Sequence, residues 1–296
     1  MRLLLVVILA LVVLVGCADG APPTVLLVAT ATPVQAQIAA ATPIASTRMP
    51  SADSTRPPTA RPSRATATPT IDPDLLLPDL QTLPPYDLVI RVVSATDRKL
   101  LRLSNSILNG GPGAIEMLGV FNPATGKTTV TQHIYKVDGS SEDRAAGEFV
   151  YHPGHQHWHL ENFVSYEVWS LTQEGALDAV VAFSDKVSYC LQDDSRSDIP
   201  GSSPRRIYTR CDREVQGISI GWIDTYTWDT EGQIVDITHV PDNLYALRST
   251  VDPANRLWEV DDTNNSATVY IEIVDNRVRI VDEASVRERL RVLETE

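Results

Sequence analysis

The chain is predicted to fold as an all-β protein, a β-sandwich of short antiparallel strands with long loops and a short C-terminal helix. Short runs of aromatic and β-branched residues recur along its C-terminal three quarters, as strands require. Turn sequences rich in Gly, Pro, Asn and Asp separate these runs, for example N-G-G-P-G at 109–113 and V-D-N-R at 274–277. Many short strands at this spacing are typical of sandwiches, and about 200 residues are enough for one core.

The individual elements follow from the same patterns. In the last segment, acidic residues come first and arginines follow, with Val286, Leu290 and Val292 on roughly one face. A helix or tail is therefore expected at 283–296. The expected strands are 86–93, 100–108, 128–135, 155–169, 179–183, 186–191, 234–238, 244–251, 267–273 and 277–281.

The N-terminal quarter of the chain has a different composition. Residues 1–17 combine one Arg, an apolar run and a small-residue stop, as in a secretory signal peptide, and the run is short for a membrane span. This segment ends in L-V-G-C, which resembles a bacterial lipobox with Cys17 as the lipidated residue; an ordinary signal peptide is the alternative. Residues 18–76 are rich in Thr, Pro and Ala and predict a disordered tether. The domain is then expected at 77–282, outside the cytoplasm and anchored to the membrane through its lipid alone.

Charge and cysteine content limit the partners and the compartment. The formal net charge of −13 argues against nucleic acid and anionic lipid as partners. It weakly favours cationic partners such as amines, although a surplus of solvated carboxylates explains it equally well. Of three cysteines, Cys190 and Cys211 remain as a pair if Cys17 carries lipid. An oxidising compartment would let this pair form a disulfide.

Four of the six histidines lie within E-F-V-Y-H-P-G-H-Q-H-W-H-L at 148–160. Because alternate side chains of a strand point to one face, His155, His157 and His159 would converge on one point. Three imidazoles in this arrangement predict a transition-metal site for copper or zinc, with coordination positions left open as in catalytic sites. His152 has the opposite strand parity and is interpreted as a supporting residue. A polar cluster without metal is the alternative.

Two later segments hold reactive side chains. Lys186 lies among apolar residues in F-S-D-K-V-S-Y-C-L-Q-D-D, where burying an ammonium group is costly unless it is paired or altered. Tyr226 lies near Asp224 in G-W-I-D-T-Y. Considered alone, each has a simpler explanation: a lysine whose stem lies along the surface and a core tyrosine with a solvated hydroxyl.

Taken in order, these segments resemble the lysyl oxidase family. The histidine motif Y-H-P-G-H-Q-H-W-H is preceded by V-T-Q-H-I-Y-K-V-D-G-S. It is followed by D-K-V-S-Y-C-L-Q-D-D, D-T-Y, G-Q-I-V-D-I-T and E-V-D-D-T-N-N, so that the resemblance covers residues 77–275. It implies a copper amine oxidase on a β-sandwich, with a lysine tyrosylquinone made from the protein's own Lys and Tyr.

By position, the resemblance places copper on His155, His157 and His159 and joins Lys186 to Tyr226 in the quinone. It implies that a primary amine, either peptidyl-lysine or a small amine, is oxidised to an aldehyde. Dioxygen would be consumed, and ammonia and hydrogen peroxide released. Asp224, close to Tyr226 in the sequence, is the candidate general base.

The resemblance also implies a structural calcium site that joins the two ends of the domain. Its oxygen ligands, from carboxylates and amides, are of the kind that calcium prefers. An Asp/Asn-rich turn whose side chains cap their own backbone is the alternative. The implied ligands are Asp79, Leu80, Glu259, Asp261, Asn264 and Asn265.

The chain departs from the animal members of the family. They are cysteine-rich, and one of their cysteines lies in the histidine motif, where this chain has Pro153-Gly154. Three other functions remain open. The first is a non-catalytic copper-binding lipoprotein that never forms the quinone, and the second is a β-sandwich adhesion module. The third is a zinc hydrolase, which would need Glu161 as its base.

Overall fold

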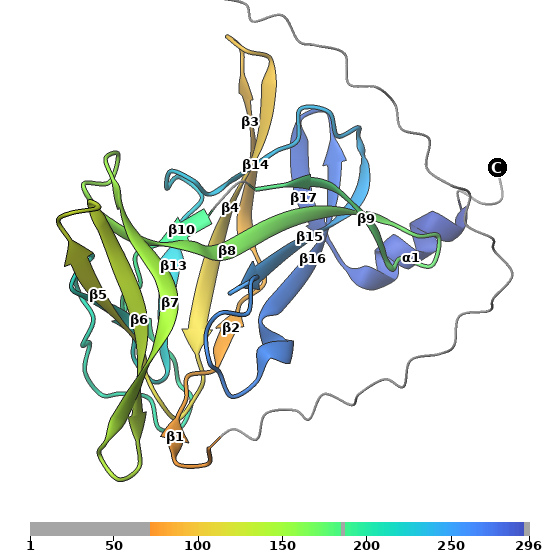
Figure 1. Cartoon of the computed structure of the whole chain (residues 1–296). Helices are drawn as coiled ribbons and strands as arrows, with labels where there is room; N and C mark the ends of the chain where they lie inside the picture. Colours follow the sequence, from red (N-terminus) through yellow and green to blue (C-terminus); the bar gives the residue numbers. More distant parts are fainter. Residues whose placement is uncertain (1–71, 185–186, 293–296) are drawn as a thin grey trace, which may run out of the picture. The chain divides into compact units, whose positions relative to one another are not determined.

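The predicted all-β class is confirmed by the computed structural model of the chain, which describes residues 72–184 and 187–292. The strands form two sheets, and all of their pairings are antiparallel (Figure 1). Within the described ranges the single α-helix is α1 (Glu283–Val292), at the expected place. No helix in these ranges is long and apolar enough to cross a membrane.

The first sheet has eleven strands, eight of them in the order β12-β5-β6-β7-β8-β15-β16-β17. Three more strands lie outside this order: β1 pairs with β6, and both β9 and β10 pair with β8. Its strands are β1 (Leu75–Leu76), β5 (Ile115–Asn122), β6 (Lys127–Lys136), β7 (Ser141–His152), β8 (His157–Leu171), β9 (Leu177–Phe183), β10 (Val187–Tyr189), β12 (Val215–Ile218), β15 (Asn243–Val251), β16 (Ser266–Val274) and β17 (Arg277–Val281).

The second sheet has six strands and is arranged around the long strand β4. Strands β2, β3, β13 and β14 all pair with β4, and β11 extends the sheet beyond β13. A short 3-10 helix, η1 (Asp262–Asn264), lies between the two last long strands of the other sheet, β15 and β16. The strands are β2 (Leu80–Thr82), β3 (Tyr86–Val93), β4 (Arg98–Asn109), β11 (Ser195–Arg196), β13 (Trp222–Tyr226) and β14 (Ile234–Asp236).

Strand β8 lies in the middle of the first sheet and connects its two halves. Its first residues pair with β7, whereas Val164–Trp169 pair with β15 (Figure 1). β10 lies along its other edge and pairs Tyr189 with Leu160. Because β8 is fixed by partners along its length, the histidines at its start are held by a well-paired strand.

The main hydrophobic core lies between the two sheets, and two smaller clusters lie apart from it. Phe163 and Val168 of β8 pack in the same buried cluster as Leu103 and Ile107 of β4. Tyr226 of β13 belongs to this cluster too, and its ring centroid lies 6.1 Å from that of His159 on β8. The packing of the sheets therefore brings a tyrosine of one sheet to the histidines of the other.

Most expected strands are found. β3 and β17 have the predicted bounds, and β4, β6, β9, β14, β15 and β16 differ by at most two residues at an end. The prediction missed β5, β7, β12 and β13, as well as the short strands β1, β2 and β11. β7 begins with S-E-D-R-A-A-G-E, which has low strand propensity, and it forms because β6 and β8 supply partners on both sides.

Replacing Phe163 with Ala tests the shared core. Phe163 is 1% exposed, so Phe163→Ala should lower the free energy of unfolding by about 3–5 kcal/mol. Urea denaturation followed by tryptophan fluorescence measures this loss. Val181→Ala on the exposed face of β9, where the side chain is 42% exposed, is the control and should change stability by less than about 0.5 kcal/mol.

Candidate metal centre

The histidines are presented by a hairpin rather than by a single strand. β7 ends at His152 and β8 begins at His157, so His155 lies in the four-residue turn between them. The N–H groups of His155 and Gln156 both donate to the carbonyl of His152, at 3.2 and 2.8 Å. Gln156 takes a left-handed conformation with φ 59°. The predicted start of the strand at residue 155 is therefore wrong, because these N–H groups close a turn and Pro153 has none to offer a strand.

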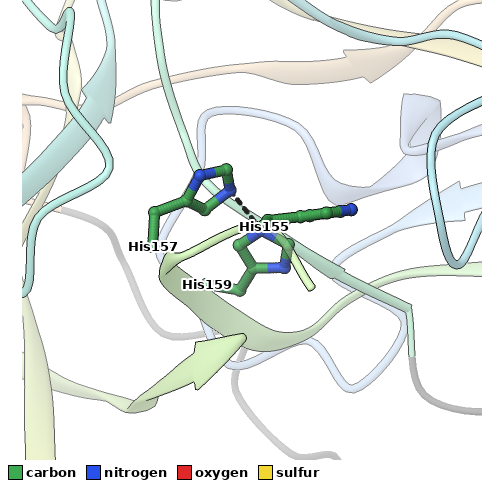
Figure 2. A group of neighbouring side chains, drawn as sticks. All are labelled: His155, His157 and His159. Carbon is green, nitrogen blue, oxygen red and sulfur yellow. Dashed lines mark hydrogen bonds between the residues drawn. The ribbon is translucent and has the colours of Figure 1, made fainter. Parts of the chain in front are cut away.

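The three predicted histidines nevertheless meet at one point, as Figure 2 shows. Nε2 of His157 lies 2.7 Å from Nε2 of His159, and Nδ1 of His155 lies 3.3 Å from the same atom. Each ring offers a nitrogen within 4.8 Å of the other two. Strand alternation brings His157 and His159 to one face, and the turn folds His155 back over them.

The local environment keeps these rings neutral. Burial, and then the neighbouring imidazoles, lower the pKa of His155 and of His157. The same causes lower the pKa of His159, which is almost fully buried, to about 3. Neutral imidazole is the form that binds metal ions.

The arrangement fits a metal ion better than it fits a hydrogen-bonded cluster. Nε2 of His159 carries either one proton or one lone pair, yet two other ring nitrogens face it. A single cation accepts a lone pair from all three rings. Nδ1 of His159 lies 3.1 Å from Oγ of Ser188 on β10, and this contact fixes the ring as outer partners of metal ligands do.

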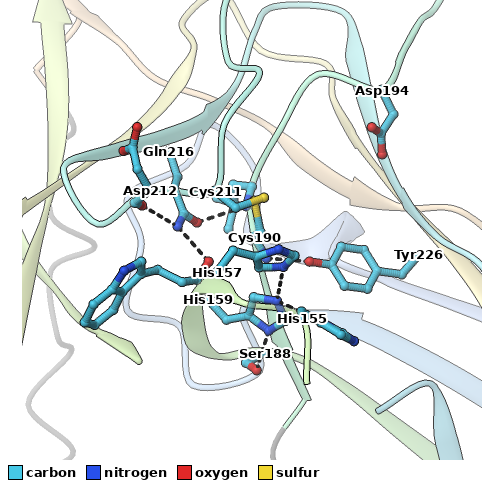
Figure 3. The surroundings of a disulfide bond; sticks show 12 residues. His155, His157, His159, Ser188, Cys190, Asp194, Cys211, Asp212, Gln216 and Tyr226 are labelled. Carbon is cyan, nitrogen blue, oxygen red and sulfur yellow. Dashed lines mark hydrogen bonds between the residues drawn. A yellow bond between two sulfur atoms is a disulfide. The ribbon is translucent and has the colours of Figure 1, made fainter. Parts of the chain in front are cut away.

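Tyr226 stands beside this cluster and is held at both its hydroxyl and its ring. The backbone N–H of Cys190 donates to the hydroxyl at 2.6 Å (Figure 3). The ring stacks on Tyr189 with centroids 3.9 Å apart, and it meets His159 edge-on. Burial, followed by the charge of Asp224, raises the pKa of Tyr226 well above its usual value. The phenol is therefore neutral and oriented.

Histidines and tyrosine open into one shared pocket. His155, His157 and Tyr226 line a pocket of ≈ 330 Å³, together with Cys211 and Thr230. This volume lies at the small end of ligand sites and suits a side chain or a small molecule. The cluster is therefore accessible from outside although its innermost histidine is buried.

The predicted disulfide between Cys190 and Cys211 is confirmed, and it lies at this pocket. Cys190 holds the Tyr226 hydroxyl, and the carbonyl of Cys211 accepts the N–H of Trp158 at 3.0 Å. Trp158 stands between two of the histidines on β8. The covalent bond therefore links the histidine strand to the anchor of the tyrosine (Figure 3).

Asp224, the candidate base, lies on the inward side of β13. It is fully buried, and the side chain of Asp194 and the backbone of Gln192 lie next to its carboxyl group. Burial, and then the neighbouring carboxylate of Asp194, raise the pKa of Asp224 well above its usual value. The described residues that line the pocket do not include it.

Most of the implied calcium ligands lie close together near the start of β2. Glu259 is buried and accepts hydrogen bonds from the backbone of Leu80 at 2.7 Å and from the amide of Asn265 at 2.8 Å. Asn264 donates to Asp79 at 2.8 Å. Burial raises the pKa of Glu259 to about 8, as expected for a carboxyl group without a neutralising cation.

Two further observations separate the members of this group. The amide oxygens of Asn264 and Asn265 are buried and have no hydrogen-bond partner within the described ranges, so both are free to bind a cation. Asp261 differs, because it accepts hydrogen bonds from the backbone and hydroxyl of Thr263 at the start of η1. It therefore behaves as the self-capping turn residue that the alternative interpretation expected.

Three further predicted residues remain to be placed, and the sequence analysis missed one residue near the site. Lys186 and Cys17 lie outside the described residues. Glu161 is on β8, but it is not among the described residues that line the pocket. Glu231, which the sequence analysis did not single out, groups with His152 and His155. Its D-T-E-G context indicated only a turn, so the sequence offered no signal for it.

Comparison with known proteins gives a consistent result. Residues 138–282 match the lysyl oxidase family. The chain is 31% identical over 169 residues to lysyl oxidase homolog 4 of Mus musculus and 32% identical over 169 residues to that of Homo sapiens, in each case 57% of this chain and 18% of the relative. It is 36% identical over 124 residues to lysyl oxidase homolog 1 of Homo sapiens, 42% of this chain and 20% of the relative. The chain thus spans about a fifth of the length of these relatives.

Removing the hydroxyl that supports His159 should weaken metal binding without removing a ligand. We expect Ser188→Ala to lower the affinity for divalent copper by about 10- to 100-fold, the usual effect of losing an outer partner of a ligand. Competition with a chromophoric chelator measures the affinity. Ser140→Ala, in the exposed turn between β6 and β7, is the matched control. Equal affinities for both variants would show that Ser188 has no such role.

Proposed function

We propose that this protein, which belongs to the lysyl oxidase family through its residues 138–282, is a copper-dependent amine oxidase. The observation that carries the proposal is the meeting of three neutral imidazoles and one oriented tyrosine at a single pocket. The substrate would be a primary amine, either a small amine or a lysine side chain. The products would be an aldehyde, ammonia and hydrogen peroxide.

His155, His157 and His159 would hold the copper ion. A His-only donor set suits divalent copper, which binds nitrogen sites more tightly than the other first-row divalent ions do. In this proposal the bound copper and dioxygen would supply the oxidising power needed to convert Tyr226, joined to Lys186, into a quinone cofactor that accepts two electrons from the amine. Lys186 is assigned this role because of its position in the D-K-V-S-Y-C-L-Q-D-D motif.

The protein's own contribution at Tyr226 is orientation and control of a proton. The Cys190 N–H and the Tyr189 ring fix the phenol, so that its edge faces His159. Because burial raises the pKa of the phenol, its proton would be released only if a positive charge lay nearby. A copper ion held by the three histidines would provide that charge.

Asp224 remains the proposed base for the substrate's α-proton. It shares the inward face of β13 with Tyr226. A cationic amine in the pocket would lower the raised pKa of this buried carboxyl group and favour the carboxylate. Asp224 would then gain its basic form with substrate present.

Cationic amines also fit the electrostatics around the pocket. Asp194 accepts the backbone N–H of Thr225, a pocket residue, and Glu231 lies within ligand distance of His155. Asp194 also pairs with Arg206, which leaves Glu231 as the carboxylate next to the histidines that would attract an ammonium group, in a chain with a formal net charge of −13. A volume of ≈ 330 Å³ admits a linear amine or a lysine side chain.

The proposed location is extracytoplasmic, with Cys17 as a lipid anchor and residues 18–76 as a tether. The disulfide at the pocket supports this location, since such bonds persist in oxidising compartments. We further propose calcium as a structural ion on Asp79, Leu80, Glu259, Asp261, Asn264 and Asn265, supported by the unpartnered amide oxygens.

Peroxide release tests the oxidase. Copper-loaded, aerated protein should release hydrogen peroxide when given primary amines, as measured by a peroxidase-coupled assay. Tyr226→Phe should reduce the rate to background because the phenol oxygen is required for the quinone. Tyr86→Phe, at an exposed tyrosine of β3, should keep the wild-type rate.

Three results would contradict the oxidase. Full activity in Tyr226→Phe would exclude the tyrosine as the cofactor precursor. Wild-type protein that binds copper on its histidines but releases no peroxide with any amine would instead favour the non-catalytic copper-binding lipoprotein. Protein that binds no copper would favour the adhesion module.

Calcium should stabilise the domain if it binds at the proposed ligands. A ligand at about 100 times its Kd stabilises the folded state by about 2.7 kcal/mol, so calcium should raise the melting temperature by several degrees. Glu259→Gln should abolish this rise, because it removes the buried charge that calcium neutralises. Glu214→Gln, at an exposed glutamate, is the control. Differential scanning fluorimetry with and without calcium measures the effect, and an unchanged melting temperature in wild-type protein would contradict the site.

A further inference from the structure

A second group of potential metal ligands lies next to the cluster of His155, His157 and His159. His152, His155 and Glu231 each offer a ligand atom within 4.8 Å of the other two. Two imidazoles and one carboxylate form a donor set that binds divalent zinc and copper. His155 belongs to both groups, so the two sets are adjacent positions that share one residue.

His152 has a nitrogen that is available for such a role. Its ring lies 4.5 Å from that of His155 and stacks on that of His159, with centroids 5.0 Å apart. Nδ1 of His152 is buried and has no hydrogen-bond partner in the described part of the chain. A buried polar atom without a partner is costly, and a bound ligand would relieve that cost.

Glu231 is brought to the histidines by a loop that the second sheet holds in place. The loop connects β13 to β14, and Arg102 of β4 donates to its carbonyls at Trp228, at 2.6 Å, and Thr230, at 2.7 Å. The turn before His155 is shaped to receive the carboxylate. A Cβ on Gly154 would lie 2.3 Å from Oε2 of Glu231, so a larger residue there would displace it.

The two groups differ in depth. Glu231 is exposed and His152 and His155 are half-buried, whereas His159, found only in the first group, is 2% exposed. The first group consists of imidazoles alone, whereas the second includes the exposed carboxylate of Glu231. An incoming hydrated cation therefore meets the group with the carboxylate before it reaches the deeper one.

We propose that His152, His155 and Glu231 form an entry position that captures a divalent copper ion and passes it to His155, His157 and His159. The transfer is a ligand exchange in which His155 stays bound. His152 and Glu231 leave the ion as His157 and His159 bind it, and its oxidation state does not change. The inference rests on the proposed metal centre but not on its oxidase activity.

The rate of copper loading tests the entry position. Stopped-flow quenching of tryptophan fluorescence would follow the mixing of metal-free protein with divalent copper. Glu231→Gln should load about tenfold more slowly, because the charge that attracts the ion is gone, while its equilibrium affinity changes by less than about threefold. Asp229→Asn, at an exposed acid of the same loop, is the matched control and should load like wild type.

Two outcomes of this experiment overturn the proposal. Loading of Glu231→Gln at the wild-type rate would show that the carboxylate captures nothing. A large loss of equilibrium affinity in Glu231→Gln would make Glu231 a ligand of the final position instead. Loading through Glu231 in a protein that releases no peroxide would contradict the proposed oxidase and leave the entry position standing.

A variant that blocks the transfer provides an independent test. His157→Ala removes one ligand of the final position and none of the entry position, so it should still bind one copper ion per chain. His157→Ala/Glu231→Gln should bind at least about tenfold more weakly, whereas His157→Ala/Asp229→Asn should bind like His157→Ala. Equilibrium dialysis gives the affinities, and electron paramagnetic resonance reports the change in ligand set. Equal affinities and spectra for the two double variants would contradict the proposal.

Discussion

The close approach of three uncharged imidazole rings is the constraint on which the rest of the site depends. When two ring nitrogens lie 2.7 Å apart, protons on both of them would clash and positive charges on both rings would repel. Burial keeps the rings neutral, and Ser188 fixes the innermost one. The hairpin supplies the geometry, since two rings come from alternate positions on β8 and one from the turn that precedes it.

The second requirement is a tyrosine at a fixed distance from those rings, and tertiary packing meets it. Tyr226 belongs to the sheet built around β4, whereas His157 and His159 begin a strand of the other sheet. The shared core sets the spacing between them, and the disulfide reinforces it at the pocket wall. A buried phenol hydrogen-bonded to Cys190 and stacked on Tyr189 is oriented before any cofactor forms.

The sequence pattern predicted those parts of the site whose residues lie close together in the chain. Alternation over five residues was enough to predict that His155, His157 and His159 converge, although a turn supplies the first of them. The strand that carries Tyr226 was missed because W-I-D-T-Y is short and contains an acid, and pairing with β4 is what makes it a strand. Glu231 could not be predicted, because Arg102 and Gly154, distant in sequence, place its carboxylate.

We propose that copper held by the histidine cluster would convert the protein's own side chains into a cofactor. Peptide mass analysis of copper-loaded, aerated protein tests this proposal. We expect a covalent link between the peptides that contain Lys186 and Tyr226, absent from protein kept without copper. Copper bound at the histidines, with both peptides recovered unlinked, would contradict it and leave a copper-binding protein without the quinone.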